Sequence, residues 1–205
     1  MDKTDYFIEI FEKAEARYGE SQKRLAGDDW SAGWQTLIAT ILSAQTRDEV
    51  TIPVAEALFK KYPSINKLAS ARLPDVERII RRLNFYKNKS RHIIAAAAWL
   101  KNNKYIVPDS IDELVKIPGV GRKTANLVLS VVHAQDSITV DTHVFAICNL
   151  LGFAHAKTPA ETEMQLKQYI PKNYWSRINR VFVLWGKDVP RKTKARLLHA
   201  LDNDS

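Results

Sequence analysis

Lys123 and Asp141 are the two residues whose types could support covalent chemistry, and they lie eighteen positions apart. A lysine amine has a pKa near ~10.4 and is a poor nucleophile at neutral pH. Partial desolvation at a positive helix N-terminus would lower that pKa, so that the amine could attack a sugar carbon and form a Schiff base. A carboxylate could activate the amine and stabilise developing positive charge. The structural alternatives are a surface charge for Lys123 and a helix N-cap for Asp141.

A glycine-containing turn precedes the lysine. Gly119 and Gly121 bracket Val120, and a new helix is predicted to begin at about Arg122. Two glycines allow positive φ and leave no Cβ in the way, so the N–H groups of the turn and of the helix N-terminus can form an anion-binding concavity. The segment 114–126 therefore predicts a hairpin that binds backbone phosphate, with an ordinary helix–helix turn as the alternative.

Hydrophobic periodicity predicts helices almost throughout the chain. Few segments alternate with the period of two that is typical of strands, so the predicted fold class is all-α. Thr46 can cap one helix, and Ser110 and Thr158 begin sequences typical of capping boxes. The predicted helices span residues 4–18, 34–44, 47–62, 74–83, 88–102, 110–118, 122–133, 141–151, 160–170, 175–185 and 191–201.

The composition limits the class of protein. A chain of 205 residues, 45% of them hydrophobic, can bury a core in one domain or two small lobes. The net charge of +8 fits a nucleic-acid partner, and it fits a solvated lysine surface equally well. The single cysteine, Cys148, can form neither an internal disulfide nor a multi-cysteine metal site. With no signal-peptide core and no run of ~20 apolar residues, we expect a soluble, cytoplasmic monomer without membrane contact.

Three sequence blocks resemble the endonuclease III family of DNA glycosylases, within the helix-hairpin-helix/Gly-Pro-Asp superfamily. The blocks are LSAQT at 42–46, IPGVGRKTAN at 117–126 and VDTH at 140–143. Their order and spacing also match, and the resemblance covers roughly residues 30–186. It implies a protein that binds damaged double-stranded DNA and is associated with the nucleoid if the organism is a prokaryote.

The resemblance also implies a domain organisation. Two helical lobes would enclose a central cleft that holds the active site. One lobe would be a six-helix barrel over residues 26–135, containing the helix-hairpin-helix at about 111–133. The other lobe would join residues 1–25 to residues 136–205 and would carry Asp141.

By the same resemblance, Lys123 is the Schiff-base nucleophile and Asp141 its acidic partner. The implied reaction is base excision followed by β-elimination at the resulting abasic site, acting mainly on oxidised pyrimidines such as thymine glycol. Most members of the family bind a [4Fe–4S] cluster through four cysteines near the C-terminus, and such a cluster needs four thiolates. This sequence has no such cysteines, so we expect no iron–sulfur ligands and no required cofactor.

A glycosylase must extrude its target nucleotide, and another group must fill the gap. Gln45 matches the family residue that faces the orphaned base, and Phe85 falls where the family has an apolar wedge. The alternatives are a polar helix end for Gln45 and a core aromatic for Phe85. His143 could contact a phosphate or act as a structural hydrogen-bonding residue. The hairpin residues expected to contact DNA are Gly119, Val120, Gly121, Arg122 and Thr124.

Other features of the resemblance concern ions and charge. In the family, hairpin carbonyls can hold a monovalent cation that bridges to phosphate; here these would belong to Val115, Ile117 and Val120. Asn84 replaces the family's usual glycine, so the loop around Phe85 could differ in shape. A basic run between residues 78 and 91 flanks that loop. Five basic residues near the C-terminus could contact phosphate or form a solvated surface; they are Lys187, Arg191, Lys192, Lys194 and Arg196.

Two other functions remain open. A monofunctional glycosylase for mismatched, deaminated or alkylated bases is one, although such relatives usually lack the lysine at position 123. A non-catalytic helix-hairpin-helix DNA-binding protein is the other. It would need the hairpin but neither Asp141 at its distance nor Gln45.

Overall fold

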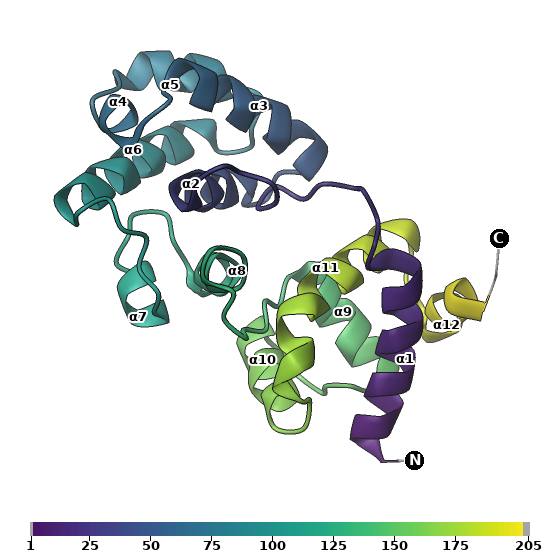
Figure 1. The fold of residues 1–205 in the computed structure, drawn as a ribbon. Helices are drawn as coiled ribbons and strands as arrows, with labels where there is room; N and C mark the ends of the chain where they lie inside the picture. The colour runs from purple at the N-terminus through teal and green to yellow at the C-terminus, as the bar shows by residue number, and fades with distance from the viewer. Residues whose placement is uncertain (1, 203–205) are drawn as a thin grey trace. The chain divides into compact units, whose positions relative to one another are not determined.

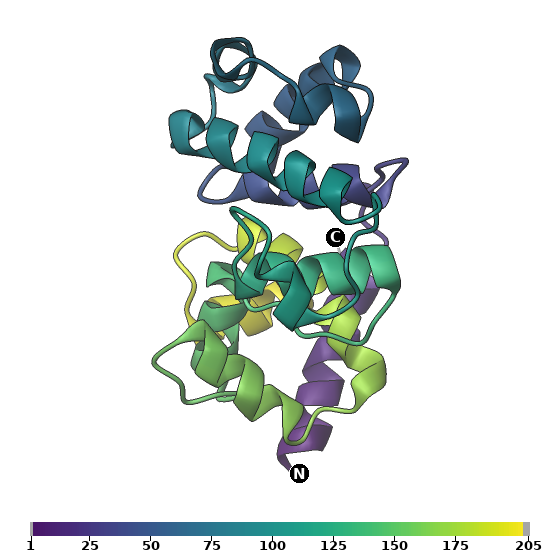
Figure 2. The same ribbon diagram turned by 90° about the vertical axis from the view of Figure 1, so that its left-hand side faces the viewer.

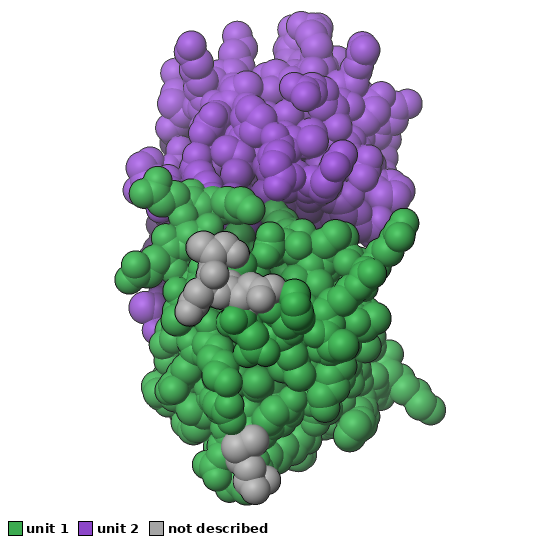
Figure 3. All heavy atoms as spheres, turned by 90° about the vertical axis from the view of Figure 1, so that its right-hand side faces the viewer, with its two compact units in different colours: residues 1–23, 135–205 green, residues 24–134 purple. Residues whose placement is uncertain are grey.

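The computed structural model describes residues 2–202, which form helices and connecting loops with no strand among them (Figure 1). The predicted all-α fold class is confirmed. The chain divides into two compact units, which Figure 3 distinguishes by colour. Unit 1 comprises residues 1–23 and 135–205, and unit 2 comprises residues 24–134.

Unit 2 is built around one nearly apolar helix. This helix packs against three others, α3, α6 and α8, and every residue from Thr36 to Leu42 is buried. A helix that is apolar on most faces must be covered on most faces, which explains its central position. Its first residue, Gly33, lies so close to α8 that a Cβ there would be 2.6 Å from Val132 Cγ1. The helices of unit 2 are α2 Gly33–Ser43, α3 Asp48–Lys61, α4 Ile65–Ala69, α5 Leu73–Ile80, α6 Tyr86–Asn102, α7 Ile111–Leu114 and α8 Arg122–His133.

Unit 1 has an aromatic core. Phe7 of α1 lies 5.0 Å from Phe153 and 6.3 Å from Phe182, measured between ring centroids. These contacts join the N-terminal helix to α11, which lies beside it in both Figure 1 and Figure 2. Burial of large aromatic rings therefore joins the beginning of the chain to its C-terminal part. The helices of unit 1 are α1 Lys3–Tyr18, α9 Thr142–Leu151, α10 Pro159–Lys167, α11 Lys172–Asp188 and α12 Lys194–Asp202.

Two of the predicted helix caps are confirmed. The Asp141 carboxylate accepts hydrogen bonds at the start of α9, and the Thr158 hydroxyl accepts one from the Glu161 N–H at 3.2 Å. Each side chain satisfies backbone N–H groups that have no partner inside the helix.

Of the two other predicted caps, Thr46 is wrong and Ser110 is confirmed only in its position. Arg47, not Thr46, is the N-cap of α3, and no side-chain hydrogen bond caps that helix. Ser110 is the N-cap residue of α7, but its side chain makes no capping hydrogen bond, and the helix ends at Leu114 rather than at Pro118. The five-residue helix α4 was also not predicted, because so short an element gives little periodic signal.

In the described part of the chain, none of the helices combines the length and the hydropathy needed to cross a membrane.

Candidate active site

The hairpin between α7 and α8 uses its two glycines differently. Gly119 has a φ of 84°, and a Cβ there would lie 2.8 Å from the Cβ of His92 on α6. Gly121 has a φ of −98°, and a Cβ there would meet nothing within 4 Å. Of the two features that glycine allows, Gly119 therefore uses the positive φ, and Gly121 contributes only the absence of a Cβ. Val120 packs inward, and its N–H donates to the Ile117 carbonyl at 3.0 Å.

Gly121 is the N-cap of α8 and has no side chain to compete for the N–H groups of the first helical turn. An anion in front of the turn could therefore accept hydrogen bonds from those N–H groups and interact with the positive end of the helix dipole. Lys123 is the second residue of α8, and its side chain is exposed. The partial desolvation expected of this lysine is therefore absent in the free chain.

Asp141 is held firmly at the start of α9. Its Oδ1 accepts from the backbone N–H groups of His143 at 2.9 Å and Val144 at 2.8 Å. The extended segment before it is fixed by Asn179, whose side-chain amide donates to the Thr139 carbonyl at 3.1 Å. The structural interpretation of Asp141 as an N-cap is confirmed. Both hydrogen bonds fall on Oδ1, so among the described residues of unit 1 no donor occupies Oδ2.

His143 packs beside this carboxylate. Its Nδ1 is buried and has no hydrogen-bond partner within the described residues. Burial lowers the pKa of the imidazole. The negative charge of Asp141 partly opposes this decrease, and the positive charges of Lys192 and Lys187 add to it. A Cβ at Gly186 would collide with the ring, so this glycine makes room for it. The predicted phosphate contact of His143 stays a prediction.

The two residues expected to fill the gap in DNA lie on exposed loops of unit 2. Gln45 follows the end of α2 with a φ of 54°, and Phe85 precedes α6 with a φ of 56°. Phe85 is 61% exposed, so the alternative of a core aromatic is wrong. A left-handed conformation costs a residue with a side chain about 1–2 kcal/mol, so both loop tips must be held by their surroundings.

A buried lysine and an asparagine join these two loops. The Asn84 side-chain amide donates to the Gln45 carbonyl at 2.6 Å, and the Asn84 N–H donates to the Thr46 hydroxyl at 3.3 Å. The Lys89 ammonium donates to the same hydroxyl at 2.9 Å and to the Leu42 carbonyl at 2.7 Å. Lys89 is only 5% exposed, and burial lowers its pKa to about 8.

These three side chains were not predicted as functional. Thr46 was predicted to be a helix cap, and Lys89 fell within the basic run that flanks Phe85. One signal could have separated Lys89 from its neighbours. It lies four residues before Ile93 and eight before Ala97, both buried, so it occupies the apolar face of its own helix.

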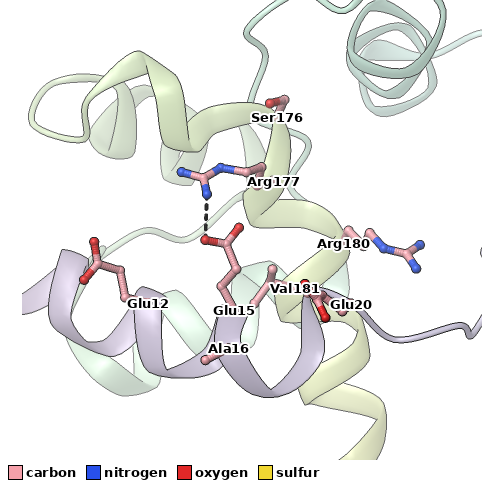
Figure 4. A pocket seen from close by; sticks show the side chains of 9 residues that line it. Glu12, Glu15, Ala16, Glu20, Ser176, Arg177, Arg180 and Val181 are labelled. Atoms are coloured by element: carbon pink, nitrogen blue, oxygen red, sulfur yellow. Dashed lines mark hydrogen bonds and ion pairs between the residues drawn. The ribbon is translucent and has the colours of Figure 1, made fainter.

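A pocket of about 770 Å³ lies between α1 and α11 within unit 1 (Figure 4). Its charged lining is internally neutralised in part, because Arg177 forms an ion pair with Glu15 at 2.6 Å. The Arg177 guanidinium also lies over the Tyr174 ring, 4.9 Å from its centroid. None of the residues predicted for chemistry or DNA binding lines it. The candidate site is therefore elsewhere.

The residues offer little to a metal. Among the described residues, no group of three or more His, Cys, Asp or Glu side chains could hold an ion. Cys148 is the only cysteine in the sequence, and burial raises the pKa of its thiol, so the donor set does not fit a four-thiolate cluster. Of the three carbonyls expected to hold a monovalent cation, that of Ile117 already accepts the Val120 N–H. This cation site, with Val115 as its third member, stays a prediction.

Two groups of predicted residues emerge, one in each unit. Unit 2 joins the loops of Gln45 and Phe85 through the hydrogen bonds of Asn84, and it places Lys123 at the hairpin. Unit 1 brings together Asp141 and His143.

These features agree with a known family. Residues 38–172 match the family model described as HhH-GPD superfamily base excision DNA repair protein. The chain belongs to this superfamily.

Within the superfamily the chain is similar to endonuclease III. It is 41% identical to endonuclease III of Thermotoga maritima over 158 residues, which cover 76% of this chain and 74% of that protein. It is 34% identical to the Bacillus subtilis endonuclease III over 156 residues, covering 75% and 71% of the two chains. The fold matches that of a trapped endonuclease III–DNA covalent intermediate with a TM-score of 0.87 at 32% identity, over 97% of this chain and 95% of that one. A thermostable thymine-DNA glycosylase shares the fold with a TM-score of 0.77 at 15% identity, over 94% and 93% of the two chains.

Proposed function

We propose that this protein is a bifunctional DNA glycosylase and abasic-site lyase that removes oxidised pyrimidines, such as thymine glycol, from double-stranded DNA. The observation that carries the proposal is the position of Lys123. It lies in the first turn of α8, directly after the hairpin whose N–H groups can donate hydrogen bonds to a phosphate. A DNA backbone bound there brings a deoxyribose within reach of an amine.

Lys123 is the nucleophile in this reaction. Its amine attacks the sugar C1′ while the bond from C1′ to the base breaks, and the electron pair leaves with the base. Loss of a proton from nitrogen and opening of the sugar ring give a Schiff base. Removal of a C2′ proton then allows the C3′–O bond to break, which is the β-elimination step. The amine is exposed in the free chain, so the desolvation that activates it comes from bound DNA.

Asp141 supplies negative charge for the same chemistry. The bonds from His143 and Val144 hold the carboxylate through Oδ1, and Oδ2 is left to stabilise positive charge on the sugar and to accept a proton. A carboxylate already fixed as a helix cap needs little reorganisation when that charge develops.

Gln45 and Phe85 replace the extruded nucleotide. The Gln45 amide can hydrogen-bond the orphaned partner base, and the exposed Phe85 ring can wedge between bases. Arg122 and Thr124 lie next to the hairpin, where they can add contacts to phosphate.

We further propose that the enzyme acts as a monomer, needs no cofactor and lacks an iron–sulfur cluster. The cytoplasm, and the nucleoid if the organism is a prokaryote, is its proposed location. The segment 187–196 carries the five basic residues that would contact phosphate in place of a cluster-bearing loop. Two of them, Lys187 and Lys192, lie close enough to His143 to lower its pKa, so the segment adds positive charge near the start of α9.

Covalent trapping tests the proposed reaction. The protein is incubated with duplexes that carry thymine glycol, uracil or an abasic site, with and without borohydride. We expect base release from thymine glycol and a reduced adduct that Lys123→Gln abolishes. Lys116→Gln is the matched control, since Lys116 lies on the α7 side of the hairpin and pairs with Glu113. Base release without an adduct would favour a monofunctional glycosylase. Binding without release from any of these lesions would favour a non-catalytic DNA-binding protein.

A second variant tests Asp141. Asn at this position can still accept the two N–H groups of α9, so the cap is kept and only the charge is lost. We expect Asp141→Asn to slow base release by a factor on the order of 100 or more while DNA binding changes little. Equal losses in the two measurements would mean that Asp141 is only a cap.

A further inference from the structure

The tips of the Gln45 and Phe85 loops adopt a conformation that their own residues disfavour. Both have left-handed backbones, at φ 54° and φ 56°, yet neither is a glycine or asparagine. Both tips are also exposed, so burial does not hold them. Contacts made by the neighbouring residues must therefore fix the two conformations.

The neighbours of the two tips bond to one another across the loops. Thr46 directly follows one tip and Asn84 directly precedes the other. The Asn84 amide bonds the Gln45 carbonyl, and the Asn84 N–H bonds the Thr46 hydroxyl. The two loops are thereby joined directly beside both tips, although they are about 40 residues apart in sequence.

Lys89 anchors this arrangement to the core of unit 2. Its ammonium donates to the Thr46 hydroxyl and to the Leu42 carbonyl in the last turn of α2. That carbonyl belongs to the negative end of the helix, where a cation is stabilised. Both acceptors are neutral oxygens, so no carboxylate offsets the desolvation of this buried charge. A methionine could fill the same space without this cost. A buried cation at this position therefore indicates a role beyond packing.

We propose that Thr46, Asn84 and Lys89 form a polar clamp that positions Gln45 and Phe85 for insertion into DNA before DNA is bound. The proposal rests on the proposed function, because it assumes that these tips enter the duplex. The three clamp residues are positioning residues: they act through the tips and contact no reacting atom. A tip that is ordered beforehand loses less conformational entropy on binding, so the clamp lowers the cost of extrusion.

Asn84 gives the clamp a feature of this chain in particular. A glycine at this position would supply the N–H to Thr46 but not the amide that bonds the Gln45 carbonyl. The backbone of Asn84 itself is not in the left-handed region, so the residue is not strained there. The side chain thus adds a link between the loops without straining the backbone.

Thr46→Val and Thr46→Ser test the clamp as a matched pair. Valine has the shape of threonine but lacks the hydroxyl that accepts from both Lys89 and Asn84, whereas serine keeps it. Thr51→Val is the control, because the Thr51 hydroxyl bonds only within its own helix, to the Arg47 carbonyl at 3.0 Å. Asn84→Ala is a second test variant, and its exposed position leaves the core intact.

Two activities separate positioning from general damage. Base release from a thymine glycol duplex requires extrusion, whereas Schiff-base formation on a single-stranded abasic site requires none. We expect Thr46→Val and Asn84→Ala to slow base release from the duplex about five- to tenfold, the effect of losing one or two hydrogen bonds. Adduct formation on the single strand stays at the parental level, and Thr46→Ser and Thr51→Val behave like the parent in both assays.

Amide hydrogen exchange on the free protein provides a readout that needs no chemistry. Thr46→Val removes the acceptor of the Asn84 N–H, so that amide and its neighbours should exchange faster, with no change in Thr51→Val. Parental exchange and parental base release in Thr46→Val would overturn the clamp. An equal fall in the duplex and single-strand activities would also overturn it, because the residue would then only support folding. If the parental protein releases no base, the proposed function is overturned. In that case the exchange measurement still tests the clamp, which unchanged exchange at residue 84 in Thr46→Val would overturn.

Discussion

The hairpin and the pair of loop tips are both irregular turns in unit 2, but they are built in opposite ways. The hairpin depends on missing side chains. Gly119 tolerates a positive φ and the close approach of His92, and Gly121 leaves space in front of α8. The loop tips have side chains at their left-handed positions and depend on three polar residues to hold them: Thr46 and Asn84, which adjoin the tips, and Lys89 of α6.

This difference affects what each region can contribute. A glycine turn exposes N–H groups to a phosphate that every nucleotide has, so it binds without regard to sequence. An insertion into the base stack needs a side chain at the tip. Glycine is therefore excluded from each tip, although the left-handed backbone there would favour it. The conformational cost of 1–2 kcal/mol per tip must then be met by contacts elsewhere.

The largest effect is expected from Gly119→Ala. A Cβ at this position is disfavoured by the φ of 84° and would press on the His92 side chain at 2.8 Å. We expect the free energy of unfolding to fall by about 2–4 kcal/mol, from backbone strain and overpacking together. Urea denaturation measures the loss.

Gly121→Ala is the matched control for this prediction. Its φ of −98° suits alanine, and a Cβ there meets nothing within 4 Å. The free energy of unfolding should change by less than about 0.5 kcal/mol. His92→Ala combined with Gly119→Ala should recover the part of the loss that comes from overpacking. Equal destabilisation by the two glycine substitutions would show that the glycines do not differ in the way described.

The same contrast explains which parts of the site were predictable from sequence. A turn built on glycine is visible because Gly119 and Gly121 are themselves the signal, and the lysine after them falls at a defined position of α8. Asp141 was equally accessible, since an N-cap is a local feature that depends on the residues immediately after it.

The clamp was not predictable in this way. Thr46 looks like an N-cap because it precedes a helix, but its hydroxyl is occupied by Lys89 and Asn84, which lie about 40 residues away. Ser110 differs from Thr46, because it does occupy the predicted N-cap position of α7. Its side chain makes no capping hydrogen bond, and Glu113 pairs with Lys116 instead. Local patterns thus identify groups that act within a few residues. Hydrogen bonds between distant loops require the tertiary structure.

An intermediate effect is expected from the pH dependence of Lys89. Folding lowers the pKa of this lysine from about 10.5 to about 8, so the protonated form opposes folding. Between these two pH values the unfolded chain binds more protons, and stability should therefore rise with pH. Lys89→Met removes this contribution. The free energy of unfolding of the parent minus that of Lys89→Met should rise by about 2 kcal/mol between pH 7.5 and 10.

The difference between two proteins is the quantity to measure, because the tyrosines also titrate at high pH. Lys87→Met is the matched control, since Lys87 lies in the same turn of α6 with an exposed side chain. Its difference from the parent should stay constant over the same pH range. A constant difference for Lys89→Met as well would mean that the ammonium is not desolvated in the folded chain, and the clamp would lose its anchor.

The smallest effect on stability, and the clearest separation of stability from function, is expected from Phe85→Gly. Glycine relieves the left-handed strain at φ 56°, which stabilises the folded chain. It also adds conformational freedom to the unfolded chain, which offsets part of this gain. Little burial is lost, because the Phe85 side chain is 61% exposed. We expect a gain of about 0.5 kcal/mol in unfolding free energy. Base release from a thymine glycol duplex should nevertheless fall, because the wedge is gone.

Lys104→Gly completes the comparison, since Lys104 has a φ of 59° on an exposed loop of the same unit and no predicted contact with DNA. It should gain similar stability and keep the parental rate of base release. A loss of stability in Phe85→Gly would mean that the ring supports the fold. An unchanged rate of base release would assign the wedge to another residue, and the left-handed tip at position 85 would then have no functional reason to carry a side chain.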